Sequence, residues 1–244
     1  MAASLLSLVV PAYKQEKTIT QDIKSLDSVL SLLPLRHEII VVVDGFVDDT
    51  FRKAEKFKSN QIKIIGYKKN KGKGFAIKTG VAAAKGDIIG FIDSGMDLDP
   101  AEVSIMLSIM EWNKADIVVG SKLHPDSRVN YPASRKILSW GYRVIIKTLF
   151  RLNVKDTQVG LKLFKGKVAK DVFSRIIVKT FAFDVEVLAV AKLLNYNKIH
   201  EAPIKLNFRQ GSVTSSNFWK IAFRMMWDTL AIFYRLRIKN YYKK

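Results

Sequence analysis

The sequence predicts an α/β domain of the Rossmann-like kind, with a mostly parallel sheet and helices on both of its faces. Three observations support this fold class. Short apolar runs rich in β-branched residues alternate with helical patterns through the first 120 residues, as in parallel βα units. The strand runs are nearly continuous apolar stretches, which is expected of strands buried on both faces. The 244 residues are 48% hydrophobic, and no internal repeat or linker divides them.

The elements of the first half follow one another in a regular order. Five strands are predicted, at residues 5–10, 38–45, 62–67, 87–93 and 115–120. Four helices are predicted, at residues 16–33, 48–57, 74–84 and 101–112. Ligands of such sheets bind beyond the carboxyl ends of the strands. We therefore expect the functional residues in the loops 11–16, 44–49 and 93–99.

Beyond residue 120 the alternation weakens, and two amphipathic helices are predicted at residues 134–150 and 217–238. In each, basic and apolar side chains lie on different sides of the helical wheel. The basic rows are Lys136, Arg143, Lys147 and Lys220, Arg224, Arg235; the apolar rows are Leu138, Ile145, Leu149 and Met226, Leu230, Phe233. Between the two helices we predict a turn and strand at 156–164, a helix at 183–194 and a strand at 199–208.

The domain organisation predicted from these patterns is one domain over residues 1–215. Residues 216–244 extend the same domain as a basic amphipathic helix. An apolar face flanked by lysine, arginine and tryptophan suits a membrane surface, whereas ordinary packing on the sheet is the alternative for part of each amphipathic helix.

The formal net charge of +19 is spread through the sequence and favours anionic partners, such as phosphorylated substrates or an anionic membrane surface. Nucleic acid is set aside, because no recognition motif accompanies the charge. The absence of cysteine excludes disulfides and thiolate metal sites. The longest stretch without a charged residue is 1–13, shorter than the roughly 18 apolar residues of a spanning helix. We expect a cytoplasmic protein, peripheral at the cytoplasmic face of a membrane.

Three aspartates follow the fourth predicted strand within seven residues: Asp93, Asp97 and Asp99. Carboxylates at this position can hold a hard divalent cation, which would bridge a diphosphate. Asp99 precedes Pro100 and a glutamate, so we assign it to the start of the next helix. Asp93 and Asp97 remain the candidate metal ligands.

Two further loops carry candidate ligand-binding groups. Asp44 stands at the end of the second predicted strand, where it can hydrogen-bond a base or a ribose. The segment "NKGKG" joins glycine backbone freedom to Lys71 and Lys73 just before a helix, and such a loop can approach phosphate closely. Surface turns of glycine and lysine are the common alternative. The three histidines are scattered along the chain and indicate neither a metal cluster nor a catalytic histidine.

Together these motifs resemble family 2 glycosyltransferases of the GT-A fold, especially the dolichyl- and polyprenyl-phosphate sugar synthases. The resemblance covers residues 5–215. "VVPAYKQEKTI" is similar to the family's nucleotide-binding first strand and loop, "VVVDGFVDDT" to its second-strand aspartate motif, and "NKGKGFAIKTGVAAAKGDIIGFID" to a segment specific to this group. "GSK", Arg135 and "DTQVGLKLF" are similar to later motifs. "DTQVGLKLF", "FAFDVEVL" and "EAPIKL" resemble the dolichyl-phosphate glucosyltransferase branch in particular.

The resemblance implies a nucleotide-sugar site and a divalent metal, Mg²⁺ or Mn²⁺, on Asp93 and Asp97. The donor-binding residues that it implies are Pro11, Ala12, Tyr13, Glu16, Asp44, Lys73, Gly74, Asp93 and Ser94. Two positions depart from the family pattern. Val43 replaces the first of two adjacent aspartates, and Gly95 replaces the second aspartate of the Asp-x-Asp metal motif. Metal binding through Asp97 and weakened or lost metal binding are both open at this point.

The reaction implied is an inverting displacement at the anomeric carbon, with a diphosphate as leaving group. A phosphate acceptor is already anionic, so it requires positioning more than a strong base. Lys122, Arg135 and Arg209 are candidates for holding the phosphates, and solvated surface charge is the alternative for each. Asp156 is the candidate for orienting the sugar or acting as base; a turn residue is its alternative.

We therefore expect transfer of a hexose from UDP-glucose or GDP-mannose to a polyprenyl or dolichyl phosphate. The alternatives are a family 2 enzyme acting on a soluble sugar or a polysaccharide, and a catalytically inactive membrane-associated homologue.

Overall fold

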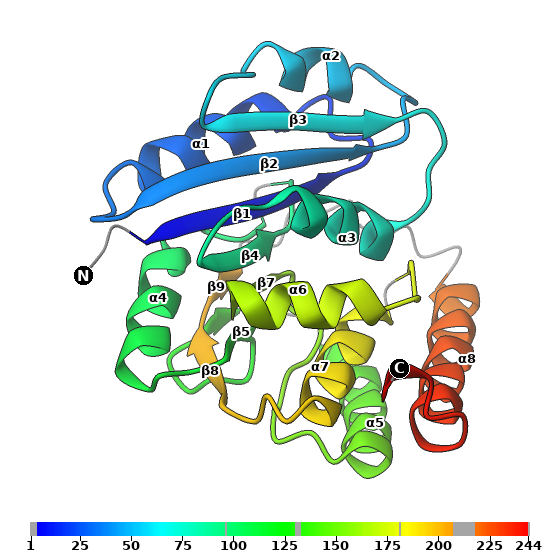
Figure 1. Cartoon of the computed structure of the whole chain (residues 1–244). Coiled ribbons are helices and arrows are strands. Elements are labelled where there is room, and N and C mark those ends of the chain that lie inside the picture. Colours follow the sequence, from blue (N-terminus) through cyan, green and yellow to red (C-terminus); the bar gives the residue numbers. More distant parts are fainter. Residues whose placement is uncertain (1–3, 96, 130–132, 181, 207–217, 244) are drawn as a thin grey trace.

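A seven-stranded sheet forms the centre of the molecule, and most of its neighbouring strands are parallel (Figure 1). The computed structural model describes residues 4–95, 97–129, 133–180, 182–206 and 218–243. The strand order is β3-β2-β1-β4-β7-β5-β8, and β7 runs antiparallel to both of its neighbours. The seven strands are β1 (Leu5–Ala12), β2 (Arg36–Asp44), β3 (Ile62–Tyr67), β4 (Ile88–Ile92), β5 (Ile117–Ser121), β7 (Leu161–Lys165) and β8 (Ile199–Pro203).

Two apolar cores lie on opposite faces of this sheet, because successive side chains of a strand point to opposite faces. In β1, Leu8 and Val10 enter one core while Val9 enters the other; in β2, Val41 and Val42 divide in the same way. All five side chains are fully buried. This explains why the strand runs are apolar throughout.

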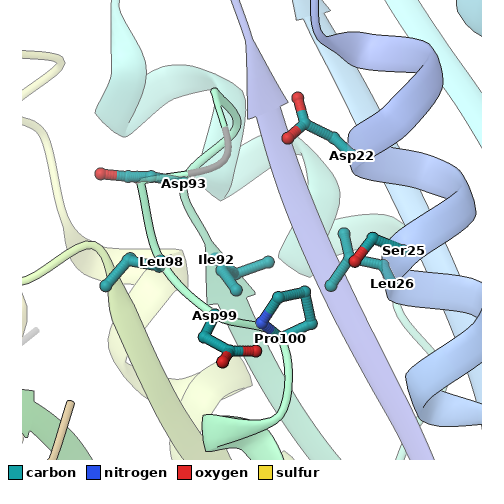
Figure 2. A pocket seen from close by; sticks show the side chains of 8 residues that line it. All are labelled: Asp22, Ser25, Leu26, Ile92, Asp93, Leu98, Asp99 and Pro100. Atoms are coloured by element: carbon teal, nitrogen blue, oxygen red, sulfur yellow. The ribbon is translucent and has the colours of Figure 1, made fainter. Parts of the chain in front are cut away.

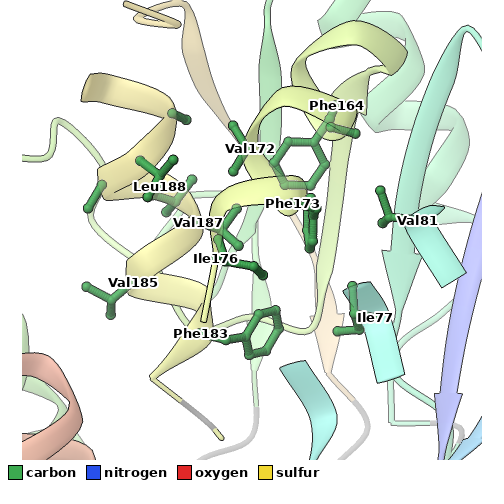
Figure 3. Close-up of a cluster of buried hydrophobic side chains, with 14 of the residues drawn as sticks. Ile77, Val81, Phe164, Val172, Phe173, Ile176, Phe183, Val185, Val187 and Leu188 are labelled. Atoms are coloured by element: carbon green, nitrogen blue, oxygen red, sulfur yellow. The ribbon is translucent and has the colours of Figure 1, made fainter. Parts of the chain in front are cut away.

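Helices cover both faces of the sheet, as predicted. Residues of α1, α2 and α4 belong to one core and residues of α3, α6 and α7 to the other, which Figure 3 shows around Phe173 and Phe183. These helices are α1 (Ile19–Leu30), α2 (Thr50–Glu55), α3 (Lys73–Ala83), α4 (Glu102–Trp112), α6 (Gly166–Arg175) and α7 (Phe183–Leu193).

Two features of the second half differ from the sequence-based expectations. Helix α6 was not predicted, although Val168, Val172 and Phe173 carry a helical spacing and are buried. The strand predicted at 199–208 is wrong in extent. The backbone of Ile204 bonds to Ser127 and Arg128 instead, which ends β8 and starts a second, two-stranded sheet. That sheet pairs β6 (Arg128–Val129) with β9 (Lys205–Leu206).

The two amphipathic helices form as α5 (Ala133–Phe150) and α8 (Phe218–Arg237) and gather with α7 at one end of the molecule (Figure 1). Phe233 of α8 packs on Phe150 of α5, with ring centroids 6.2 Å apart. The chain then folds back through a short 3₁₀ helix, η2 (Tyr241–Lys243), and fully buries Tyr242. Within the described residues, no helix combines the length and the apolar character needed to cross a bilayer.

The predicted rows of α8 divide between the surface and the interior. Arg235, from the predicted basic row, has its guanidinium 3.5 Å from the buried carboxylate of Glu186. Leu230, from the predicted apolar row, is about half exposed. The sequence places side chains around a helix axis, but it does not show which side the neighbouring helices cover.

Candidate functional site

The carboxyl ends of β2, β1 and β4 lie side by side, and their loops are joined by hydrogen bonds. The backbone N–H of Glu16 donates to the Asp48 carboxylate over 3.4 Å, and the N–H of Asp49 donates to the Glu16 carboxylate over 3.3 Å. The Ser94 hydroxyl donates to the carbonyl of Pro11 over 2.8 Å. The three loops predicted to be functional therefore form one rim.

The predicted donor residues after β1 differ in exposure. Pro11 and Ala12 are buried parts of the strand, whereas Tyr13 is 40% exposed at the rim. Glu16 is half-buried, and its carboxylate accepts a hydrogen bond from the N–H of Asp49 over 3.3 Å. Of these four residues, Tyr13 offers the largest accessible side chain to a ligand.

Asp44 is buried and shapes the neighbouring glycine-lysine loop. Its carboxylate accepts hydrogen bonds from the Asn70 side-chain amide (2.9 Å) and from the backbone N–H groups of Lys71 (2.7 Å) and Gly72 (2.9 Å). Burial, and then Asp44, raise the pKa of the Tyr67 hydroxyl above its ordinary value, so Tyr67 stays neutral beside the carboxylate. This loop-holding role was not predicted; binding of a base by Asp44 stays a prediction.

At the point where the loop leads into α3, its backbone lies in close contact with the backbone of Lys179. Gly72 has φ of 98°, and a Cβ at this position would lie 2.3 Å from the carbonyl oxygen of Lys179. The N–H of Gly74 donates to that same carbonyl over 2.9 Å. Only glycine fits at position 72, since a side chain would be both strained and blocked. The segment before α7 therefore sets where α3 begins.

The first residue of α3, Lys73, pairs with Asp93 at the end of β4. Its ammonium lies 2.7 and 2.8 Å from the two carboxylate oxygens. The Asp93 side chain is 34% exposed and the Lys73 side chain 22%. Burial lowers the pKa of Lys73, but the charges of Asp93 and Asp184 outweigh burial and raise it above its ordinary value. Lys73 is therefore a charged group that faces the rim.

A second ion pair lies behind the first. Lys162 of β7 is fully buried and donates hydrogen bonds to the Asp184 carboxylate of α7 and to the carbonyl of Val159, the latter over 2.7 Å. Burial lowers the pKa of Lys162 and raises that of Asp184, and the charge of each partly offsets the shift of the other. Sequence reasoning missed this pair. A lysine within the apolar strand "LKLFK" was the available signal.

Gly160 leaves the space that the Asp93 carboxylate occupies. The carbonyl of Gly160 accepts a hydrogen bond from the N–H of Asp93 over 2.8 Å, and a Cβ on Gly160 would lie 1.8 Å from the Asp93 carboxylate. Asp93, Lys73, Asp184 and Lys162 therefore form a ring of alternating charges. The backbone of Val159 and Gly160 completes this ring between Lys162 and Asp93. Each charge in this ring has an opposite charge beside it.

The loop after β4 holds the other carboxylates. Asp99 accepts a hydrogen bond from the N–H of Ala101 over 3.0 Å, in the turn before α4, but the N-cap of α4 is Ala101 and not Asp99 as predicted. Gly95 has φ of 106° and its N–H donates to Asp22 of α1. Asp97 is half-buried in the same loop. A cavity of about 190 Å³ lies between α1 and this loop. In Figure 2 the Asp93 carboxylate is directed away from α1.

The residues present fit a divalent cation that takes part of its ligands from a substrate. The Asp93 side chain is 34% exposed, and Mg²⁺ is commonly held by one or two carboxylates together with substrate phosphates. A metal site made of protein ligands alone is not formed by the described residues. Across the described residues, no group of three histidine or acidic side chains is arranged for a metal ion.

Lys122 and Asp156 are brought together at the end of β5. The Lys122 ammonium lies 3.4 Å from Asp156, and the backbone N–H of Lys122 donates to the same carboxylate over 3.1 Å. Asp156 is buried and also accepts the N–H of Gln158 over 3.1 Å, so it does organise a turn. The side chain of Arg135 and the whole of Arg209 lie outside the described residues.

Comparisons with known proteins agree with this geometry. The family model described as Glycosyl transferase family 2 matches residues 7–173. The chain belongs to this family. The predicted GT-A architecture is confirmed by the mostly parallel sheet and by a solved neighbour, glucosyl-3-phosphoglycerate synthase from Mycobacterium tuberculosis in complex with Mn²⁺, UDP and phosphoglyceric acid. That neighbour has a TM-score of 0.73 and 19% identity, and the alignment covers 95% of this chain and 79% of the other.

Two relatives share more sequence with the chain. A dolichyl-phosphate beta-glucosyltransferase of Dictyostelium discoideum is 31% identical over 94% of this chain and 74% of its own length. A protein of the same name from Homo sapiens is 32% identical over 84% of this chain and 67% of its own length. The resemblance inferred from the motifs is thereby confirmed.

The buried pair makes a prediction about stability. Lys162→Met leaves Asp184 buried without its partner and should lower the free energy of unfolding by about 3–5 kcal/mol, measured by urea denaturation. The double variant Lys162→Met/Asp184→Leu should recover most of this loss. The control is Lys165→Met on the same strand, whose exposed pair with Asp116 is worth less than about 1 kcal/mol. Equal losses for Lys162→Met and the control would contradict the analysis.

Gly160→Ala should disturb the site more than the fold. The added methyl group displaces the Asp93 carboxylate, and a shift of about 1 Å near reacting groups can lower activity roughly 10²-fold. Transfer rate and melting temperature should be measured together. Gly141→Ala is the matched control, since a Cβ there meets nothing within 4 Å. Wild-type rates in Gly160→Ala would disprove the role assigned to this glycine.

Proposed function

We propose that this family 2 glycosyltransferase moves glucose from UDP-glucose to a dolichyl or polyprenyl phosphate, with inversion at the anomeric carbon. The observation that carries the proposal is the similarity of nearly the whole chain to two dolichyl-phosphate beta-glucosyltransferases. GDP-mannose is the second donor to be tested.

The rim of charged groups supports binding of a nucleotide diphosphate. Lys73 offers an ammonium at the start of α3, and the loop from Asn70 to Gly72 is held in one shape by Asp44. A positive charge held at this place stabilises a departing diphosphate. Asp93, with Asp97 in the same loop, would hold Mg²⁺ or Mn²⁺, which supplies additional positive charge to the leaving group when bound.

The charged groups at the end of β5 suit a phosphate acceptor. Its oxygen is already anionic, so it requires a cation to position it rather than a strong base. Lys122 stands beside Asp156 at the end of β5 and is our candidate for this task, together with Arg135 and Arg209. Asp156, buried and anchored to the turn, would orient Lys122 or the sugar.

An exposed apolar row on α8 supports action at a membrane surface. Phe223 is 72% exposed and Trp227 66%, and Leu230, Tyr234 and Ile238 continue the row at helical spacing. Arg224 and Arg237 are exposed on the same helix. Aromatic and apolar groups flanked by arginine bind the headgroup region of anionic bilayers. We place the protein at the cytoplasmic face, where nucleotide sugars are available.

The transfer reaction should depend on Asp93. We expect labelled glucose from UDP-glucose to appear on a short polyprenyl phosphate as a product that mild acid releases. Asp93→Asn should lower the rate about 10³-fold, because a charge that holds the cation and Lys73 is lost. Asp99→Asn is the control, since it makes the same change in the same loop and keeps the oxygen that accepts the Ala101 N–H.

Three outcomes of that assay would contradict parts of the proposal. Label on a soluble sugar or polysaccharide alone would replace the lipid acceptor. Label on lipid from GDP-mannose alone would replace the donor. Absence of transfer to any acceptor, with intact donor binding, would indicate a catalytically inactive homologue.

Membrane binding should depend on the exposed row. Phe223→Ser/Trp227→Ser should reduce co-sedimentation with anionic liposomes about tenfold or more, since each large side chain contributes roughly 1.5–3 kcal/mol when buried. Wild-type binding should also weaken as salt rises. Trp112→Ser removes a tryptophan of α4 that is 90% exposed, more than Trp227, and should bind as the wild type does. Equal loss in both variants would argue against α8 as the contact.

A further inference from the structure

Lys73 occupies the carboxylate that the proposed metal ion would use. Its ammonium lies 2.7 and 2.8 Å from the two oxygens of Asp93. A divalent cation on those oxygens would lie close to the ammonium, and like charges at such distances repel strongly in a partly buried site. Lys73 and the cation therefore compete for Asp93.

Several contacts keep the Lys73 ammonium at this place. Lys73 follows Gly72, whose backbone N–H is fixed by Asp44. The ammonium lies 5.7 Å from the centre of the Phe183 ring. Phe183 belongs to α7, the helix that also carries Asp184. The Asp184 carboxylate also attracts the Lys73 ammonium, and Lys162 balances much of its charge from behind. The pair with Asp93 is thus a built feature rather than a chance surface contact.

The loop after β4 adds no carboxylate at the second position of the motif. Gly95 has φ of 106°, and a Cβ at this position would be in ordinary van der Waals contact with the Gln15 side chain, whose nearest atom would lie 3.6 Å away. A cation on Asp93 therefore lacks a ligand that an aspartate at position 95 would provide. Phosphate oxygens of a donor are the natural replacement.

We propose that Lys73 is a built-in counter-ion that keeps Asp93 from holding a divalent cation until a nucleotide diphosphate enters the site. The diphosphate attracts the ammonium away from Asp93, and the freed carboxylate then accepts the cation together with the phosphates. Metal and nucleotide consequently bind with positive coupling, and each raises the affinity for the other by the same factor. This inference rests on the proposed metal site and adds the order in which its charges are exchanged.

The coupling is measurable without turnover. Mn²⁺ binding should be titrated, by the electron paramagnetic resonance signal of free Mn²⁺, with and without UDP. We expect the wild type to bind Mn²⁺ at least about tenfold more tightly with UDP. Lys73→Gln should bind Mn²⁺ about tenfold more tightly than the wild type in the absence of UDP. Its coupling should be smaller by the same factor, and the remainder comes from the phosphate oxygens that UDP provides. Asp93→Asn should bind Mn²⁺ weakly in both conditions.

Two lysine variants serve as controls. Lys73→Arg keeps the charge, and its guanidinium can pair with Asp93, so Mn²⁺ binding without UDP should stay as weak as in the wild type. Lys71→Gln removes a charge from the same loop, but that ammonium lies over the Phe75 ring, 4.5 Å from its centre. Mn²⁺ binding to Lys71→Gln without UDP should therefore equal that of the wild type.

The outcomes separate this inference from the function on which it rests. Equal Mn²⁺ affinity of the wild type with and without UDP, or unchanged affinity in Lys73→Gln, would overturn the counter-ion role and leave the proposed transfer intact. If UDP binds but Mn²⁺ binds no variant under any condition, the metal site itself is disproved and the counter-ion role falls with it. Tighter binding to Lys73→Gln and Lys71→Gln alike would reduce the effect to net charge and also overturn the inference.

Discussion

The ring of alternating charges around Asp93 determines how the rest of the site is arranged. Asp93 stands at the end of β4, paired with Lys73, while the buried Asp184–Lys162 pair lies behind and Gly160 leaves the necessary space. A buried ion pair contributes little net stability but is costly to break. The four charged residues belong to or adjoin β4, β7, α3 and α7. The cost of breaking their ion pairs therefore holds these two antiparallel strands and two helices in one relative position, at the point where the chemistry is expected.

A second consequence of this arrangement is the connection between the donor rim and the helices at the far end of the molecule. The short segment 176–180 contacts both. On one side, the Lys179 carbonyl accepts the N–H of Gly74 and the Ile176 carbonyl accepts the Lys78 ammonium. On the other side, the Thr180 hydroxyl donates to Asp228 of α8. The donor loop and the helix with the exposed apolar row therefore share one structural support.

Glu186 completes that support. Its carboxylate is fully buried and accepts hydrogen bonds from the N–H groups of Ile177 and Val178, the Tyr242 hydroxyl and Arg235. Burial raises the pKa of Glu186, whereas these hydrogen bonds and the guanidinium oppose the shift. One acidic side chain thus fastens the support segment, α8 and the C-terminal turn to α7. Glu186, which the sequence analysis names only as part of the motif "FAFDVEVL", is central to the packing.

The sequence by itself determined the fold class, the order of most elements and the rim of loops, because strand burial and helix amphipathicity leave local periodic patterns. It also determined the family, because "NKGKGFAIKTGVAAAKGDIIGFID" and its companion motifs are local strings. Only the tertiary structure decided what Asp44, Lys73 and Asp93 contact, since their partners lie about 20 to 30 residues away. The same holds for the Lys162–Asp184 pair, the reversed direction of β7 and the exposed side of α8. Each of these depends on which distant segments pack together, and no periodic pattern within one segment contains that information.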